Sequence, residues 1–257
     1  MQNMTLKGQV AIISGGVGDI GLACALELAR RGADIAIGDI LPEAKATPAL
    51  EKIRALGRRA RYDLVDVSDS DRVTKWFADV EADLGLATLI VPNAAVVNFT
   101  SSINTPAEQW RKELSVNLDG SFFMAQAGAK RLIERKSKGR IVFMGSWAAH
   151  SPHPFITTYS VSKAGLRMLC QCMASDLAPH GVLVNEVAPG WVDAGLTGDR
   201  FRKFPHERQG AESRIPVGIL IDPHDVALQV AHLCEPANKH MTGTVIVMDG
   251  GLSIKPR

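Results

Sequence analysis

Several features are scarce in this chain of 257 residues, and each scarcity excludes a class of protein. Four scattered cysteines are too few for a disulfide framework, and Cys170 and Cys172 would project from different sides of a helix. No apolar run reaches membrane-spanning length, and residues 1–7 lack the basic-then-apolar pattern of a signal peptide. A net charge of +2 is too small to indicate a nucleic acid or an anionic membrane as partner. We therefore expect a cytoplasmic protein with reduced cysteines and neither of those partners.

The abundant feature is a regular alternation of strand and helix patterns. Hydrophobic residues make up 46% of the chain and charged residues 22%, which suits a substantial core. Short apolar strands, rather than strands of alternating polarity, indicate a parallel sheet covered by helices on both faces. No repeat or Pro/Ser-rich linker divides the chain, so one domain over residues 1–257 is expected. The expected strands are 10–14, 35–39, 61–67, 88–91, 141–144, 182–187 and 244–248, and the expected helices are 20–31, 42–56, 69–84, 105–136, 158–178 and 223–235.

Chemistry is concentrated between Ser146 and Lys163. Tyr159 and Lys163 stand four residues apart in a predicted helix, so both can face one ligand. A phenol titrates near ~10 and is a poor base at neutral pH, but a neighbouring ammonium favours the phenolate and lowers its pKa. Ser146 follows the apolar strand 141–144, where its hydroxyl could bond the same substrate oxygen. Taken alone, Tyr-x-x-x-Lys is also compatible with a solvated pair on a helix surface.

Ser146, Tyr159 and Lys163, with thirteen positions from serine to tyrosine, resemble the catalytic set of the classical short-chain dehydrogenase/reductase family. The resemblance covers essentially the whole chain and implies a single-domain α/β fold. That fold is a Rossmann-type, doubly wound parallel sheet of about seven strands with helices on both faces. It also implies that Tyr159 exchanges the substrate hydroxyl proton while a hydride moves to or from a nicotinamide. Lys163 would lower the tyrosine pKa and bind the nicotinamide ribose, and Ser146 would orient the reacting oxygen. Asn117 would be the fourth catalytic residue, holding a water that connects Lys163 with solvent.

A glycine loop, SGGVGDIG at residues 14–21, lies between the first strand and the first helix. Glycine allows close approach to a pyrophosphate, and the helix N-terminus offers unpaired N–H groups. Two registers are open: Gly-x-Gly-x-x-Gly beginning at Gly16, or the family pattern Thr-Gly-x-x-x-Gly-x-Gly beginning at Ser14. We favour the family register, which places Asp19 at the middle glycine, either as a helix cap or as a cofactor contact. The predicted cofactor residues of the loop are Ser14, Gly15, Asp19, Ile20 and Gly21.

Asp39 ends the second predicted strand, eighteen residues beyond Gly21. A carboxylate here can accept hydrogen bonds from both ribose hydroxyls of NAD and would repel the 2′-phosphate of NADP. No Lys or Arg occurs in residues 14–21 or immediately after Asp39. The sequence therefore predicts NAD as the cofactor.

Three further segments resemble cofactor-binding motifs of the family. Asp66 and Val67 resemble the pair at the adenine ring. Residues 92–95, PNAA, resemble Asn-Asn-Ala-Gly, and residues 188–194, APGWVDA, resemble the Pro-Gly motif with alanine in place of threonine at its end. In this last motif the backbone of Val192 would meet the carboxamide. The implied cofactor contacts are Asp66, Val67, Asn93, Ala94, Pro189, Gly190 and Val192, in addition to Tyr159 and Lys163.

Two segments are expected on the substrate side. In residues 147–155, Trp147, His150 and His153 can pack against or hydrogen-bond a polar substrate, and no third ligand supports reading the histidines as a metal site. Residues 193–216, the longest stretch without periodicity, lie where the family has its substrate lid. Between 199 and 214 the lid carries five Lys/Arg and three acidic residues.

These lid cations have two interpretations. They either keep a solvated lid soluble, or one or two of them fold inward over a carboxylate, sulfonate or phosphate of the substrate. Closure would then exclude water from the hydride transfer. The predicted substrate residues are Ser146, Trp147, His150, His153, Tyr159, Arg202, Lys203 and Arg208.

The sequence thus predicts an NAD-dependent oxidoreductase acting on a secondary alcohol, sugar or polyol, including a sugar acid or other anionic sugar, or on the matching carbonyl. Family analogy implies a homotetramer assembled partly through helices 106–136 and 158–178. Two alternatives stay open. An NADPH-dependent enzyme like the 3-oxoacyl reductases is disfavoured by Asp39. A dinucleotide-binding sensor or structural protein without turnover is disfavoured by the four intact catalytic residues.

Overall fold

The strands form a single parallel sheet. The computed structural model describes residues 4–254, apart from the side chains of residues 196 and 199. Both ends of the expected 1–257 domain, and the Asp199 side chain of the lid, therefore lie outside the described residues. Each neighbouring pair is parallel, and the order across the sheet is β3-β2-β1-β4-β5-β6-β7. The strands are β1 (Val10–Ser14), β2 (Asp34–Asp39), β3 (Ala60–Leu64), β4 (Leu89–Val91), β5 (Gly139–Met144), β6 (Val182–Pro189) and β7 (Val245–Met248).

The chain reverses its direction of travel across the sheet at β1. It moves outward from β1 through β2 to β3, and then continues on the other side of β1 with β4. In open α/β sheets, ligands bind outside the carboxyl ends of the strands at such a switch point. The predicted Rossmann-type, doubly wound sheet of about seven strands is confirmed.

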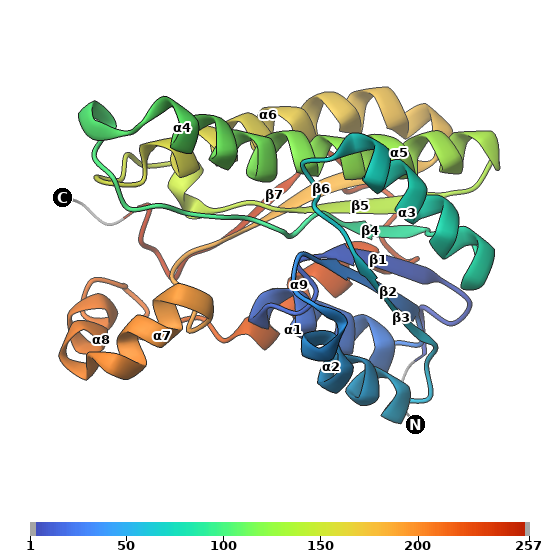
Figure 1. Cartoon of the computed structure of the whole chain (residues 1–257), viewed down its shortest axis with the longest axis horizontal. Helices are drawn as coiled ribbons and strands as arrows, with labels where there is room; N and C mark the ends of the chain where they lie inside the picture. The colour runs from blue at the N-terminus through green and yellow to red at the C-terminus, as the bar shows by residue number, and fades with distance from the viewer. Residues whose placement is uncertain (1–3, 255–257) are drawn as a thin grey trace.

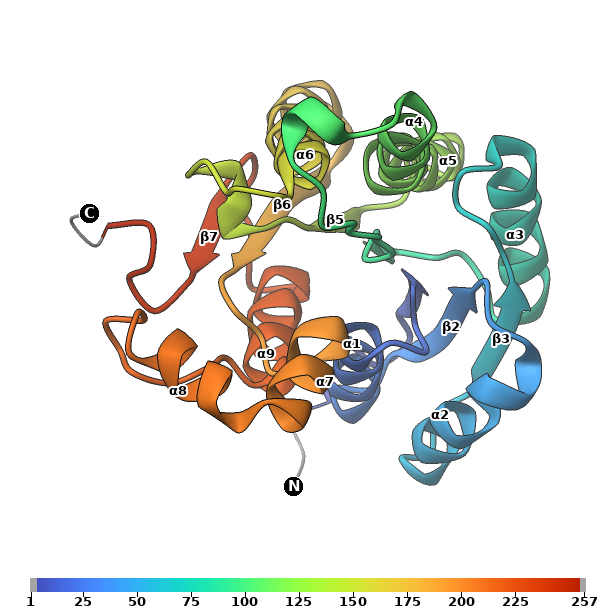
Figure 2. The ribbon, with the colours of Figure 1, turned by 60° about the vertical axis from the view of Figure 1, so that its left-hand side comes forward.

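Helices cover both faces of the sheet (Figures 1 and 2). Successive strand side chains point to opposite faces: Val142 packs in the core cluster on one face, whereas Ile141 and Phe143 pack in the cluster on the other. This alternation of buried side chains explains why the strands read as continuous apolar runs. The helices are α1 (Asp19–Arg30), α2 (Glu43–Ala55), α3 (Ser70–Asp83), α4 (Ala107–Leu114), α5 (Gly120–Glu134), α6 (Thr157–Leu177), α7 (Gly195–Lys203), α8 (Pro205–Glu212) and α9 (Pro223–Cys234).

Two segments differ from the sequence expectation. The expected helix 105–136 is interrupted by a π-helical turn, Ser115–Asp119, between α4 and α5. The lid region, residues 193–216, contains the short helices α7 and α8, which Figure 2 shows beside the sheet below β6 and β7. No regular helix was predicted there because apolar residues are sparse; among the described side chains, Phe201, Ala211 and Ile215 form a small buried cluster with Leu220.

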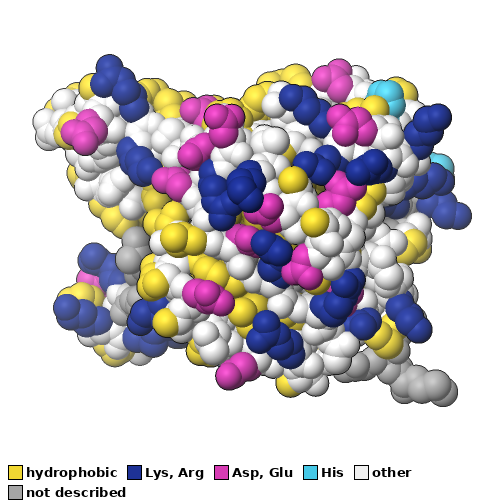
Figure 3. Space-filling view, turned by 45° about the vertical axis from the view of Figure 1, so that its right-hand side comes forward, with side chains coloured by type: hydrophobic (Ala, Val, Ile, Leu, Met, Phe, Trp, Pro, Cys, Tyr) yellow, Lys and Arg dark blue, Asp and Glu magenta, His cyan; other side chains and the backbone are white. Residues whose placement is uncertain are grey.

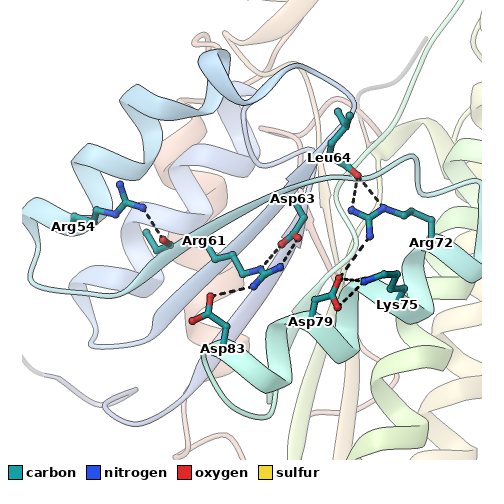
Figure 4. Close-up of polar contacts among 9 residues, drawn as sticks. Arg54, Arg61, Asp63, Leu64, Arg72, Lys75, Asp79 and Asp83 are labelled. Atoms are coloured by element: carbon teal, nitrogen blue, oxygen red, sulfur yellow. Dashed lines mark hydrogen bonds and ion pairs between the residues drawn. The ribbon is translucent and has the colours of Figure 1, made fainter.

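The edge strand β3 is closed by arginine side chains (Figure 4). Its carbonyls point alternately towards β2 and away from it, and those of Ala60 and Leu64 point away. Arg54 donates to the Ala60 carbonyl at 3.1 Å, and Arg72 donates to the Leu64 carbonyl at 2.9 Å. An edge covered in this way offers fewer free groups for pairing with another chain.

The surface carries charges of both signs. On the face drawn in Figure 3, basic and acidic side chains are interspersed, in keeping with the net charge of +2. Among residues 4–254, no helix is both long and apolar enough to cross a membrane.

Candidate active site

A cleft of about 910 Å³ opens at the carboxyl ends of the strands. The structure brings the predicted cofactor residues together here: all of them line the cleft except Ser14, which lies directly behind it at the end of β1. The lining comes from within residues 15–21, 39–41, 65–67, 93–99, 144–156 and 189–197, together with Lys112, Val116, Tyr159 and Lys163.

The glycine loop has no space for a side chain at its last position. A Cβ built on Gly21 would lie 2.2 Å from the carbonyl oxygen of Gly15, and Gly15 itself has a φ of +62°. The loop therefore holds its backbone tightly against the first turn of α1, whose N–H groups are available to an anionic ligand. This cradle fits the pyrophosphate of a dinucleotide.

Side chains at the end of β1 fix the loop that follows β4. The Ser14 hydroxyl accepts hydrogen bonds from the backbone N–H groups of Asn93 and Ala94, each at 3.0 Å. The Asn93 amide donates in return to the carbonyls of Ser14 and Gly15, at 2.9 and 3.2 Å. Ser14 is thus a structural support of the cleft, which explains its place behind the lining.

Asp39 stands at the end of β2 with its carboxylate beside the glycine loop. One oxygen accepts from the backbone N–H of Val17 at 3.2 Å, and the other accepts from that of Leu41 at 3.3 Å. These two bonds orient the carboxylate at the rim of the cleft, while Asp66 and Val67 line the same end beyond β3.

Asp19 is not the cap of α1, and its role as a cofactor contact stays a prediction, since it lines the cleft. Gly18 is the N-cap of α1, and it provides no side-chain cap. The Asp19 carboxylate instead accepts a hydrogen bond from the backbone N–H of Gly195 at 2.7 Å. Because Gly195 begins α7, this bond ties the glycine loop to the lid across one side of the cleft.

Ser146, Tyr159 and Lys163 meet at the other end of the cleft. Lys163 is 2% exposed, and its Nζ donates to the Met144 carbonyl at 2.7 Å and lies 5.5 Å from the centre of the Tyr159 ring. The Ser146 hydroxyl accepts from the backbone N–H of Ala148 at 3.1 Å and so begins a 3₁₀ turn, Trp147–Ala149. These contacts fix the three side chains at the end of β5 and the start of α6.

Burial shifts the pKa values of both Tyr159 and Lys163. Burial raises the pKa of the Tyr159 phenol above its ordinary value, and a hydrogen bond with Ser146 opposes this with a smaller effect. Burial also lowers the pKa of Lys163 to about 8, against the opposing influence of Glu186. Nζ of Lys163 is directed to Met144, and desolvation dominates the pKa of both groups, so the lowering of the tyrosine pKa by Lys163 stays a prediction.

Asn117 is fully buried in the π-helical turn. Its side chain accepts from the Val96 N–H at 2.8 Å, and it donates to the Val96 carbonyl at 2.8 Å and to the Ser162 hydroxyl at 3.2 Å. Asn117 therefore links the loop after β4 to α6, one residue before Lys163. Its role in holding a water stays a prediction.

A buried ion pair lies next to the segment that holds Ser146 and was not predicted from the sequence. Glu186 in β6 is fully buried and accepts from Arg167 of α6 at 3.0 Å. A Cβ on Gly145, the residue before Ser146, would lie 2.0 Å from the Glu186 carboxylate. The signal was present in the sequence as a single acid inside the apolar strand 182–187.

Arg167 also contacts Nδ1 of His150 at 2.9 Å. His150 is therefore directed to Arg167 and is not among the described residues that line the cleft, so its role in binding substrate stays a prediction.

The lid cations are also oriented differently from the inward-facing prediction. Arg208 pairs with Asp193 at 2.7 Å and with Glu212 at 2.9 Å, and Arg202 lies 3.7 Å from Asp193. Lys203 lies over the Phe204 ring. None of these three cations is among the described lining residues, because acids of the lid itself and an aromatic ring hold them. Their role in binding an anionic substrate stays a prediction that requires the lid to rearrange.

Residues 147–156 and 189–197 supply several of the aromatic side chains of the site. Trp147 and His153 line the cleft as predicted, with their ring centres 4.2 Å apart. Trp191 lines it as well, although the sequence argument singled it out only as part of the Pro-Gly motif. Within the described residues 4–254, no three His, Cys, Asp or Glu side chains are grouped to hold a metal ion.

Comparison with known proteins identifies the family. A family model described as enoyl-(acyl carrier protein) reductase matches residues 16–253. A short-chain dehydrogenase/reductase of Hericium erinaceus is 34% identical over 252 residues, which cover 96% of this chain and 98% of the relative. An L-rhamnose 1-dehydrogenase (NAD(P)(+)) of Sphingomonas sp. (strain SKA58) is 30% identical over 249 residues, covering 97% of this chain and 98% of the relative. The crystal structure of a short-chain type dehydrogenase/reductase from Mycobacterium marinum has a TM-score of 0.91 and 27% identity, with 99% of each chain covered. The chain belongs to the short-chain dehydrogenase/reductase family.

Proposed function

We propose that this protein is an NAD-dependent oxidoreductase that transfers a hydride between a CH–OH carbon of a sugar or polyol and the nicotinamide. The observation that carries the proposal is one continuous cleft with a dinucleotide cradle at one end and Ser146, Tyr159 and Lys163 at the other. The sugar class is supported by the relative described as an L-rhamnose 1-dehydrogenase.

Different parts of the cleft would bind different parts of the cofactor. The glycine loop and the N-terminus of α1 would hold the pyrophosphate, and Asp39 would hold the adenosine ribose. Lys163 would bind the ribose next to the nicotinamide. When bound, the nicotinamide supplies the hydride acceptor for oxidation and the hydride donor for reduction.

The protein side of the chemistry is proton transfer. In oxidation, the C–H electrons leave with the hydride, the substrate O–H proton passes to the phenolate form of Tyr159, and the electrons of the O–H bond complete the C=O double bond. In reduction, Tyr159 returns the proton to the developing alkoxide. Ser146 holds the reacting oxygen in place throughout. Positioned acid–base catalysis of this kind contributes on the order of 10²–10⁴-fold, and alignment of the two reactants contributes further.

Asp39 supports NAD over NADP. Its carboxylate stands at the rim of the cleft, where an additional 2′-phosphate would meet a like charge. The family includes relatives described with NAD(P)(+), so the preference is a property that we propose for this chain rather than for the family.

We also propose a homotetramer assembled partly through α4, α5 and α6. Large apolar side chains are exposed on α4 and α6: Met168 is 59% exposed, Val161 45% and Trp110 37%. Side chains of this kind on long helices suit burial in a subunit contact. Light scattering on the purified protein tests the proposal, and a monomer at working concentration would contradict it.

Initial rates on the purified protein test the function. NAD and NADP are each offered with sugars, polyols, sugar acids and hydroxy acids, and formation of the reduced nicotinamide is followed by its absorbance. We expect turnover of at least one sugar or polyol, with a higher kcat/KM for NAD. Tight NAD binding without turnover of any compound would indicate a sensor instead. Preferential NADPH-dependent reduction of 3-oxoacyl thioesters would indicate the acyl-chain alternative.

A further inference from the structure

The substrate end of the cleft has a wall of two tryptophans. Trp147 and Trp191 both line the cleft, and their rings meet edge to face with centres 5.7 Å apart and planes at 88°. Trp147 comes from the turn after β5, and Trp191 comes from the segment between β6 and α7. This arrangement is a favourable geometry for aromatic pairs, so each ring stabilises the other in position.

Both rings are held on further sides. His153 packs on Trp147 with ring centres 4.2 Å apart, and the guanidinium carbon of Arg214 lies 5.0 Å from the centre of the Trp191 ring. The backbone around Trp191 is paired with Ile221, whose N–H donates to the Trp191 carbonyl at 3.0 Å. The wall is therefore preformed, and a ligand that uses it loses little conformational entropy in doing so.

Few polar side chains surround this wall. The loops 93–99, 147–156 and 189–197 contribute many of the lining residues, and among the described ones only Asn93, His153 and Thr197 carry polar side chains. The Asn93 amide already donates to two backbone carbonyls. The other lining side chains of these loops, such as Val96, Phe99 and Ile156, are mostly apolar.

This composition discriminates between kinds of alcohol. A hydroxyl that leaves water without finding a partner costs free energy, and an open-chain polyol would bring one on nearly every carbon. A ring with an apolar C–H face can instead lie against an indole and present one hydroxyl to Ser146 and Tyr159. Pockets of this type fix ligand orientation with a few polar groups and gain affinity from apolar contact.

We infer that Trp147 and Trp191 are specificity-determining residues that select a cyclic, hydroxyl-poor secondary alcohol, such as a deoxy sugar in its ring form, over an open-chain polyol. The inference rests on the proposed function, since it places the ring beside the proposed proton-transfer residue. It narrows the substrate class from sugars and polyols in general to rings with an apolar face.

Three matched compounds test it: a deoxyhexose, the hexose of the same configuration and the corresponding hexitol. For the wild type with NAD, kcat/KM should be highest for the deoxyhexose and at least about tenfold lower for the hexitol. Trp191→Ala should reduce that ratio by about tenfold or more while leaving the Kd for NAD unchanged, and Trp191→Phe should keep most of it. Leu64→Ala, on the edge strand β3 and outside the described lining, is the control and should leave the ratio unchanged.

The outcomes separate this inference from the proposed function. Calorimetric titration of the same three compounds into the protein with NAD ranks their binding independently of turnover. If no compound is turned over but the ring compounds bind more tightly and lose that advantage in Trp191→Ala, the function fails and the inference stands. If the wild type turns over or binds the hexitol as well as the deoxyhexose, the inference is overturned. A ranking that is unchanged in both Trp191→Ala and Trp147→Ala would overturn it as well.

Discussion

Two arginine–carboxylate pairs illustrate how differently the body of the sheet and the lid are built. Arg167 and Glu186 join α6 to β6 at 3.0 Å, with side chains that are 16% and 0% exposed. Arg208 and Asp193 join α8 to the start of the lid at 2.7 Å, but their side chains are 39% and 26% exposed. The chemical groups are alike, whereas the access of water differs.

Access of water decides what each pair contributes. A buried carboxylate depends on its partner, because a charge left alone in the interior keeps its full desolvation cost. When an exposed ion pair separates, water solvates both charges, so the net change in free energy is small. The sheet therefore holds Ser146 on a support that is costly to disturb, while the lid is held by contacts that can be exchanged when a ligand enters or leaves.

The largest stability effect is expected from breaking the buried pair. Arg167→Met leaves Glu186 unpaired and should reduce the free energy of unfolding by about 3–5 kcal/mol. The double variant Arg167→Met/Glu186→Leu removes both charges and should recover much of this loss. Urea unfolding of the wild type and both variants measures it. A single variant as stable as the wild type would show that the interior is more hydrated than the structure indicates.

A pH-dependent effect is expected at Lys163, next to the same pair. Because burial lowers its pKa from 10.5 to about 8, the unfolded chain keeps a proton between these pH values that the folded protein has released. The contribution of Lys163 to the free energy of unfolding should therefore rise across this window, by on the order of 3 kcal/mol. Subtracting the pH profile of Lys163→Met from that of the wild type isolates the contribution. A difference that is flat or falls with pH would contradict the lowered pKa.

At the cofactor end, Asp39→Ala removes the carboxylate that would repel a 2′-phosphate. The ratio of kcat/KM for NAD to that for NADP should fall by at least about tenfold, which corresponds to about 1.4 kcal/mol. Asp34→Ala, at the start of the same strand and paired with Arg59 outside the cleft, is the control and should leave the ratio unchanged. A wild type that already prefers NADP would refute the cofactor assignment.

The smallest effect is expected in the lid. Arg208→Gln breaks the exposed pairs with Asp193 and Glu212 and should leave the midpoint of urea unfolding nearly unchanged, because exposed ion pairs contribute little to stability. Turnover of a neutral sugar should be nearly unchanged. A selective loss of activity on the matching sugar acid would instead show that Arg208 turns inward over an anion, as the alternative interpretation of the lid holds.

The sequence predicted local features well and long-range contacts poorly. Apolar runs located the central strands because both faces of the sheet are buried there, and the motifs placed Asp39, Ser146 and Tyr159 at the cleft. The π-helical turn has no distinct periodicity of its own, so one helix was expected in place of two. The bond between Asp19 and Gly195 joins residues 176 positions apart, and no local pattern reveals it. The orientation of the lid cations depends equally on tertiary packing.

The most direct test of the account is the turnover of Tyr159→Phe. This change removes one hydroxyl from a residue at the start of α6, so the fold and the Kd for NAD should be preserved. Turnover of the best substrate should fall by about a hundredfold or more, because the group that exchanges the substrate proton is gone. Near-normal turnover in a folded, NAD-binding Tyr159→Phe protein would contradict the assignment of Tyr159 as the proton-transfer residue.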